Sequence, residues 1–317
     1  MADSSHRGKP RVYTTAVTPR KLPKAMILCI ADLLMEIHGT NAAEHLPNLA
    51  PFVVEEEQAH GRPIICTVET GKPITAESTA PTLTSTAEGK STHVWLTPEY
   101  CKIALIPDAG TPCLMQATRD WRKVESDWQP GTQETYAVLN DLIMIAFVYS
   151  SALHSTATIH ASCVSVGNEA VAFIGPSGVG KSTHATLWLL HIQGARLLND
   201  DQPAIRPDND GRVHIYGTPW SGKTPCYRNE KATLKSIFFM EQAPSNNLAP
   251  LSNIAAFQQL MKATSLIGRD TVTFKEISAT QAKAASQIPA YTLKNTPGPE
   301  ALALSHGAFT HSNTPQQ

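Results

Sequence analysis

The sequence lacks the cysteine spacings of metal-binding and dithiol redox sites. Its six cysteines, at positions 29, 66, 101, 113, 163 and 226, never form a C-x-x-C pair, which argues against a zinc knuckle or a thioredoxin-like site. Most of them stand in apolar runs, where cysteine usually packs as a small core residue. We therefore expect reduced thiols and a cytoplasmic protein.

The sequence also lacks an excess of charge of one sign and any long apolar run. The formal net charge is −1, which predicts no binding to nucleic acid or to an anionic membrane. No run reaches the ~18 apolar residues that span a bilayer, and the polar start MADSSHRGKPR lacks the apolar core of a signal peptide. Aromatic residues make up only 6% and prolines number 23, so we expect a loop-rich fold with β-strands.

A chain of 317 residues can form one large domain or two moderate ones. Residues 1–130 read as a β-rich N-terminal region that begins with a disordered arm at 1–11. Residues 25–37 could form a strand or a short helix, and 76–92 reads as a mobile Ser/Thr-rich loop. Short apolar runs between turn residues predict strands at 63–68, 93–96, 101–106 and 113–117.

Residues 131–304 are predicted to form a second domain. Pro130-Gly131 marks its start, and residues 133–151 carry a long apolar face. Within it, 142–149 is apolar nearly all round, which predicts a buried helix, too short for a membrane span. Strand and helix patterns then alternate, as in α/β or α+β domains. The end of the chain, 305–317, reads as a disordered tail.

The strongest motif is a phosphate-binding loop of the Walker A type. The apolar run Ala170–Ile174 leads into Gly175-Pro176-Ser177-Gly178-Val179-Gly180-Lys181-Ser182, and 183–192 is compatible with a helix. Strand, glycine-rich loop and helix in this order are the context that the motif requires. The expected nucleotide-binding residues are Gly175, Pro176, Ser177, Gly178, Val179, Gly180, Lys181, Ser182 and Thr183.

Each residue type in the loop has a physical reason. Glycine allows positive φ angles and a close approach of the backbone to phosphate oxygens. Successive N–H groups and the helix N-terminus then provide a partial positive charge. Lys181 would bridge the β- and γ-phosphates, and the Ser182 hydroxyl would bind Mg²⁺.

An acidic pair follows the loop helix. Residues 194–198 lead into Asn199-Asp200-Asp201, which resembles a Walker B strand. Asp200 could hold Mg²⁺, and Asp201 could take the proton of an acceptor hydroxyl. Neighbouring residues on a strand point to opposite faces, so both can serve only where the strand ends or bends. An Asn/Asp-rich turn without a catalytic role is the alternative.

The strand before the loop is predicted to belong to a hairpin. Residues 158–166, the turn Gly167-Asn168 and residues 169–174 read as two antiparallel strands. The nucleotide should therefore lie on a mixed sheet. His160 stands on this hairpin and could reach the site, although a lone histidine on a strand is more often structural.

A second stretch satisfies the bare pattern G-x4-G-K-T, at 217–224. Pro219 lacks an N–H group and Trp220 is bulky, and no helical pattern follows. A structural loop is one interpretation. The other is that Lys223 and Arg228 supply cations near the transferred phosphate or an anionic acceptor. Residues 232–240 predict a buried strand, with Glu241 at its end facing the cleft.

Three motifs together carry a family resemblance. Ile159-His160-Ala161, the loop at 175–182 and Leu198-Asn199-Asp200-Asp201 resemble the catalytic domain of HPr kinase/phosphorylase, over about residues 133–300. The resemblance implies an α/β (α+β) fold, namely a mixed-sheet P-loop domain of the phosphoenolpyruvate-carboxykinase and HPr-kinase type. It also implies active-site roles for His160, Lys181, Ser182, Asp200 and Asp201.

Two departures bear on the acceptor. Thr183 stands where HPr kinases usually carry Glu, and the Glu-Ile-Arg-Gly type of stretch is missing. The N-terminal region does not match that of HPr kinases either, and a carboxykinase is typically much longer. These departures leave the acceptor open. The resemblance implies an ATP- and Mg²⁺-dependent kinase that phosphorylates a hydroxyl of a protein, peptide or small molecule. A nucleotide-binding sensor or scaffold without transfer is the rival, and an oligomer is possible.

Overall fold

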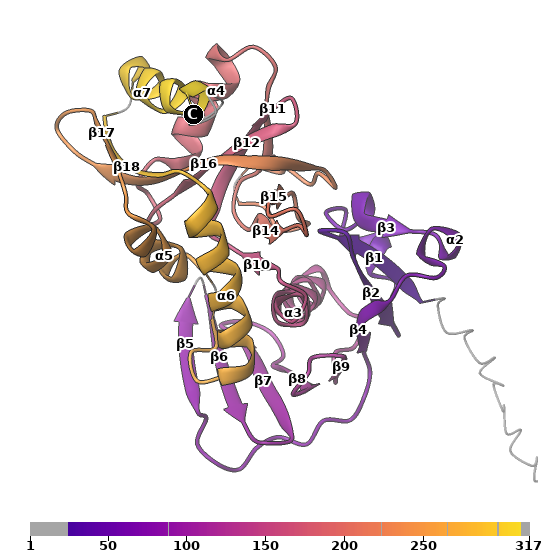
Figure 1. Cartoon of the computed structure of the whole chain (residues 1–317). Helices are drawn as coiled ribbons and strands as arrows, with labels where there is room; N and C mark the ends of the chain where they lie inside the picture. Colours follow the sequence, from indigo (N-terminus) through magenta and orange to yellow (C-terminus); the bar gives the residue numbers. More distant parts are fainter. Residues whose placement is uncertain (1–24, 88, 223, 265, 297, 312–317) are drawn as a thin grey trace, which may run out of the picture.

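The computed structural model describes residues 25–87, 89–222, 224–264, 266–296 and 298–311. The predicted arm at 1–11 lies outside these residues. Figure 1 shows two mixed β-sheets with helices packed on them, so the chain is a mixed α/β protein. The helical segments are α1 (Ala42–His45), the 3₁₀ turn η1 (Ala50–Phe52), α2 (Glu56–Ala59), α3 (Gln133–Ala152), α4 (Lys181–His191), α5 (Asn253–Lys262), α6 (Thr271–Gln287) and α7 (Pro299–His311).

The N-terminal sheet runs in the order β3-β1-β2-β4-β9-β8-β7-β6-β5. It is mixed, because β4 is parallel to both β2 and β9, while all other neighbouring strands of this sheet pair antiparallel. The four strands predicted here are confirmed as parts of β4, β6, β7 and β8. The strands are β1 (Met26–Ile30), β2 (Leu33–His38), β3 (Val53–Val54), β4 (Ile64–Glu69), β5 (Leu83–Ala87), β6 (Lys90–Leu96), β7 (Tyr100–Pro107), β8 (Cys113–Thr118) and β9 (Lys123–Ser126).

The structure decides one open N-terminal prediction in favour of strands and corrects another. Residues 25–37 hold most of the β1–β2 hairpin, whose turn places Ala31 and Asp32 at φ of 52° and 61°. The loop predicted at 76–92 is wrong in its second half, where β5 pairs with β6. Ser and Thr fit a half-exposed strand because their short side chains can pair across it, as Thr86 and Ser91 do through their hydroxyls at 3.1 Å.

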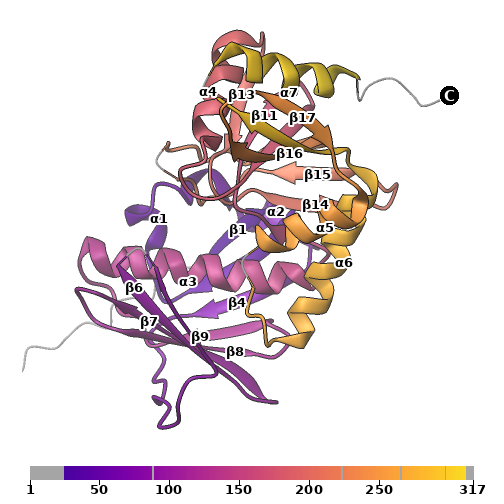
Figure 2. The same ribbon diagram turned by 90° about the vertical axis from the view of Figure 1, so that its left-hand side faces the viewer.

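Helix α3 is buried, as its apolar face predicts, and Figure 2 shows it lying along the N-terminal sheet. The whole helix has 20 residues, longer than the apolar stretch expected at 142–149, and by length and composition alone it could cross a membrane. Its packing accounts for the apolar surface, since 61% of its apolar 18-residue stretch is buried. Most of its buried residues share a core with the N-terminal sheet. Helix α3 also contacts β10 and α6, and the Phe147 ring packs on Trp220, so it lies between the two sheets.

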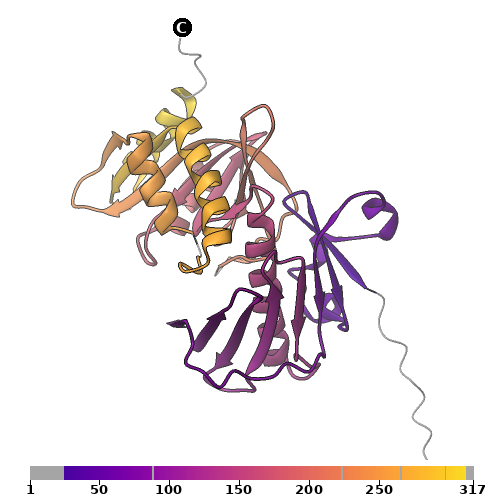
Figure 3. The ribbon, with the colours of Figure 1, turned by 60° about the horizontal axis from the view of Figure 1, so that its bottom comes forward.

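The second sheet runs in the order β10-β14-β15-β16-β12-β11-β13, and β18 pairs with β16 and β17. Helices α4 and α7 pack on one face and α5 and α6 on the other, which gives three layers (Figures 1 and 3). The strands are β10 (Ala157–Thr158), β11 (Ala161–Val166), β12 (Glu169–Ile174), β13 (Ala195–Asn199), β14 (Ala204–Pro207), β15 (Val213–Tyr216), β16 (Lys231–Gln242), β17 (Asn247–Pro250) and β18 (Ala290–Asn295).

The predicted hairpin and the mixed sheet are both present. β12 pairs antiparallel with β11 and parallel with β16, which holds the buried strand expected at 232–240. The long strand predicted at 158–166 is interrupted, however. Ile159 leaves the sheet to bridge Thr264, and β10 pairs with β14. His160 therefore lies at a break between strands.

The tail predicted from residue 305 is also a helix as far as 311. Ser305 is fully buried and accepts a hydrogen bond from Trp188 Nε1 at 3.0 Å. The rings of Phe309 and Trp188 pack edge to face with centroids 5.4 Å apart. Small residues such as Ala, Ser and Gly made this segment look like a linker, yet they let α7 lie close to α4. Residues 312–317 lie outside the described part.

Replacing Phe309 by Ala should destabilise the second sheet by about 3 kcal/mol or more, because it removes a buried ring from the α4–α7 contact. Urea unfolding followed by tryptophan fluorescence measures the loss, with the exposed Thr310→Ala as the matched control. Equal stability of the two variants would mean that α7 does not dock on α4.

Candidate active site

The phosphate-binding loop follows β12 and ends at the N-terminus of α4. Gly178 and Gly180 have φ of 80° and 102°, which side chains rarely tolerate. A Cβ atom on Gly175 would lie 2.9 Å from Val179 Cγ1 and 3.0 Å from the Met240 carbonyl oxygen. The glycines are thus required by backbone conformation and by the close approach of β16. This geometry supports the predicted loop.

Lys181 is held at the centre of the loop. Its Nζ donates to the carbonyl oxygens of Gly175 at 2.8 Å and Pro176 at 3.2 Å. Burial lowers the pKa of Lys181, and the carboxylates of Asp201 and Asp200 oppose that shift. An anion at the loop would find this ammonium group already desolvated and in place.

His160 links Lys181 to Asp201. Lys181 Nζ lies 3.1 Å from His160 Nε2, and His160 Nδ1 lies 2.8 Å from Asp201 Oδ1. An ammonium group can only donate, so Nε2 accepts and the ring proton sits on Nδ1, from which it donates to the carboxylate. The backbone fixes the same arrangement, because Ala161 N donates to the Asp201 carbonyl at 3.0 Å. The structure thus brings the three predicted residues into one chain of contacts.

Asp200 follows the last residue of β13 and bonds to a residue of β11. Its Oδ1 accepts a hydrogen bond from Ser162 Oγ at 2.5 Å, and the residue is 7% exposed. β13 ends at Asn199, which satisfies the condition that the strand stop before both acids can serve one site. Asp201 is linked to the loop through His160, which contacts Lys181.

Asn199 is a residue to which the sequence motif gave no role. Its Oδ1 accepts from the backbone N–H groups of Asp201 and Gln202, both at 2.9 Å. Its Nδ2 donates to the carbonyl oxygens of Thr218 at 3.2 Å and Trp220 at 3.1 Å. The side chain is fully buried. Asn199 therefore orients the acidic turn and joins it to the 217–222 segment.

That segment does not form a second phosphate loop. Thr218 and Trp220 are buried, and no helix follows. A Cβ on Gly222 would lie 3.1 Å from the Asp200 carbonyl oxygen, so the segment runs against the acidic turn. Lys223 lies outside the described residues. Arg228 Nη1 is 3.7 Å from Glu230 Oε1, an ion pair within its own segment.

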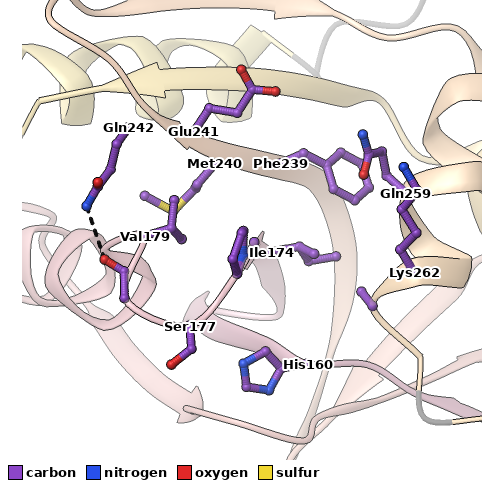
Figure 4. A pocket seen from close by; sticks show the side chains of 14 residues that line it. His160, Ile174, Ser177, Val179, Phe239, Met240, Glu241, Gln242, Gln259 and Lys262 are labelled. Carbon is purple, nitrogen blue, oxygen red and sulfur yellow. Dashed lines mark hydrogen bonds between the residues drawn. The ribbon is translucent and has the colours of Figure 1, made fainter.

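Two cavities border the loop and share Gly178, Val179 and Gln242. The larger, of about 700 Å³, reaches from His160 to Lys262 and has Phe239 in its wall. Figure 4 shows Gln242 bonded to the Gly178 carbonyl oxygen, at 3.1 Å, and the Glu241 carboxylate directed away from Ser177 and His160. The smaller cavity, of about 370 Å³, is lined by Gly178, Val179, Gly180, Thr183, His184, Leu187, Gln242, Ala243, Asn295 and Thr296.

The oxygen donors beside the loop suit Mg²⁺ bound together with a nucleotide. Within the described ranges no cluster of three or more His, Cys, Asp or Glu side chains could hold a metal ion. Mg²⁺ commonly takes only one or two protein carboxylates and completes its shell with water and substrate phosphates. Asp200 and the exposed Ser182 hydroxyl at the start of α4 fit such a site.

Comparison with known proteins gives little. No family model and no curated protein matches the chain. Among solved structures, the Hpr(Ser) kinase/phosphatase from Coxiella burnetii covers 49% of this chain and 89% of its own, with 12% sequence identity and a TM-score of 0.28. A likeness at that TM-score carries no argument, so the resemblance to HPr kinases remains a prediction.

Asn199→Ala should destabilise the protein by about 2–4 kcal/mol, because it leaves buried backbone groups without partners on both sides. The exposed Asn209→Ala is the matched control, and urea denaturation gives both values. A loss as small as that of the control would contradict the role of Asn199 as the link between the two segments.

Proposed function

We propose that this protein is an ATP- and Mg²⁺-dependent kinase that transfers the γ-phosphate to a hydroxyl group. The observation that carries the proposal is the chain of contacts from Lys181 through His160 to Asp201. It joins a phosphate-binding loop to a carboxylate that can take a proton. A loop that only binds nucleotide has no need of such a connection.

In this proposal each side chain has one task. The backbone N–H groups of 175–182 and Lys181 bind the phosphates. Asp201 accepts the proton of the acceptor hydroxyl, and His160 orients the Asp201 carboxylate through its Nδ1–H group. Ser182 and Asp200 would hold Mg²⁺, which when bound neutralises charge on the phosphates.

The smaller cavity suits the base of the nucleotide. Asn295 lines it and is 7% exposed. A side-chain amide can donate and accept together, and asparagine commonly bonds the N6 and N7 atoms of adenine. Asn295 is therefore a suitable contact for the adenine of ATP.

A nucleotide-binding sensor or scaffold is the rival function for the same site. It would use the loop but would not need the His160–Asp201 pair. All six cysteines are free. A kinase that uses ATP and keeps its cysteines reduced would work in the cytoplasm.

Lys181→Ala should abolish Mg·ATP binding, because the loop loses its buried cation, whereas Asp201→Asn should keep binding and lose transfer. Calorimetry measures binding, and γ-labelled ATP with cell extract measures transfer. Asp210→Asn, which changes an exposed carboxylate on another turn, is the control. Transfer by Asp201→Asn at the wild-type rate would refute the assignment of the base.

Asn295→Leu should weaken ATP binding about tenfold and leave inorganic tripolyphosphate binding unchanged, because only the base contacts this side chain. Titration calorimetry with both compounds, using the folded variant, separates the two contributions. Equal weakening of both ligands would show that the smaller cavity does not hold the base.

A further inference from the structure

The larger cavity is the place where the phosphate acceptor would bind, an inference that rests on the proposed function. The two cavities meet at the loop, where Gln242 and Gly178 border both. The phosphates would extend from the base cavity, beside Thr183, toward Lys181. The acceptor hydroxyl must reach Asp201, and His160, which contacts Asp201, lines the larger cavity. The larger cavity is therefore on the acceptor side.

The far wall of this cavity is fixed relative to His160. The backbone N–H of His160 donates to the Ala263 carbonyl at 2.7 Å, and Ile159 forms a bridge with Thr264. Thr264 in turn accepts a hydrogen bond from the buried Gln281 Nε2 at 2.6 Å. The end of α5, which carries Lys262, is thus tied to the same strand break that places His160.

The wall of the larger cavity carries its positive charge at one end. Lys262 is an exposed cation on α5. Figure 4 places it, with Gln259, across the cavity from Ser177 and His160, while the Glu241 carboxylate points outward. Ile174, Phe239 and Met240 supply apolar surface between these groups. A ligand here would meet a cation and an amide at one end and the transfer site at the other.

We propose that the acceptor is a small hydroxy acid, a molecule that carries both a hydroxyl and a carboxylate or phosphate group. The volume of about 700 Å³ is in the usual range for small-molecule sites. Lys262 and Gln259 bind the anionic group through charge-assisted hydrogen bonds, and the hydroxyl faces Asp201. This favours the small-metabolite kinase over the protein kinase.

Phosphoryl transfer exchanges one bond at the γ-phosphorus and moves one proton. The acceptor O–H bond breaks and its proton goes to an Asp201 carboxylate oxygen. The acceptor oxygen forms a bond to the γ-phosphorus, and the bond between that phosphorus and the bridging oxygen breaks. The bonding electrons remain on the bridging oxygen of the departing ADP. No oxidant, reductant or further reactant is needed.

The test uses the full chain with Mg·ATP and a panel of hydroxy acids, namely lactate, glycerate and malate. Neutral compounds of similar size, propane-1,2-diol, glycerol and butane-1,2,4-triol, and a serine peptide serve as comparisons. Label from γ-labelled ATP should enter a hydroxy acid in preference to the neutral compounds. Lys262→Ala should raise KM for that acid at least tenfold with a smaller change in kcat, and Lys262→Arg should restore it. Lys275→Ala, an exposed lysine on α6, is the matched control.

Binding without transfer separates this inference from the proposed function. Calorimetry with the same acids and Mg·ADP should show binding that Lys262→Ala weakens. Such binding with no label transfer would refute the kinase and retain the anion site. Labelling of the peptide or the neutral compounds alone would overturn the small anionic acceptor and retain the kinase. Equal behaviour of Lys262→Ala and Lys275→Ala would also overturn it.

Discussion

The site depends on the break between β10 and β11, where the chain leaves the sheet for two residues. Ile159 bridges Thr264, and His160 bonds through its backbone to the end of α5 and through its ring to Lys181 and Asp201. A continuous strand would place the His160 side chain on one face of a ladder with no contact to α5. One irregularity therefore joins the phosphate loop, the acidic turn and the wall of the larger cavity.

Polar contacts link the two sheets in addition to the apolar core that they share. The β1–β2 turn inserts Asp32 between Tyr216 and Lys231, at 3.0 and 2.6 Å, and Arg206 donates to the Ala31 carbonyl. A second contact pairs Arg119 with the buried Asp270, which caps α6, at 2.6 Å. Charged groups at such junctions fix orientation more than they add stability. The N-terminal sheet thus contacts β15, β16 and α6 of the second, nucleotide-loop-bearing part of the chain.

The sequence predicted the parts of the site that follow from local rules. The glycines of the loop, the strand before it and the helix after it are set by backbone conformation, so a short motif identifies them. The end of β13 at Asn199 meets the condition stated for the two adjacent acids, which point to opposite faces of a regular strand.

Other features depend on distant contacts and could not be predicted in this way. The sequence gives Asn199 only a turn position, whereas in the fold its side chain bonds to the 217–222 segment. The role of α7 depends on Trp188 and Ser305, which are more than a hundred positions apart. Asn295 and Lys262 carry no motif, and only the folded chain places them at the two cavities. The tertiary contacts of α3 likewise place it between the two sheets.

The proposed reaction moves a phosphoryl group from ATP to a hydroxyl at Asp201. Phosphorus NMR of the protein with Mg·ATP and a size-fractionated cell extract detects this transfer. Transfer gives a new phosphomonoester signal that grows in step with ADP and disappears in the Asp201→Asn variant. Bound ATP that stays intact, or ADP that forms with inorganic phosphate alone, would contradict it.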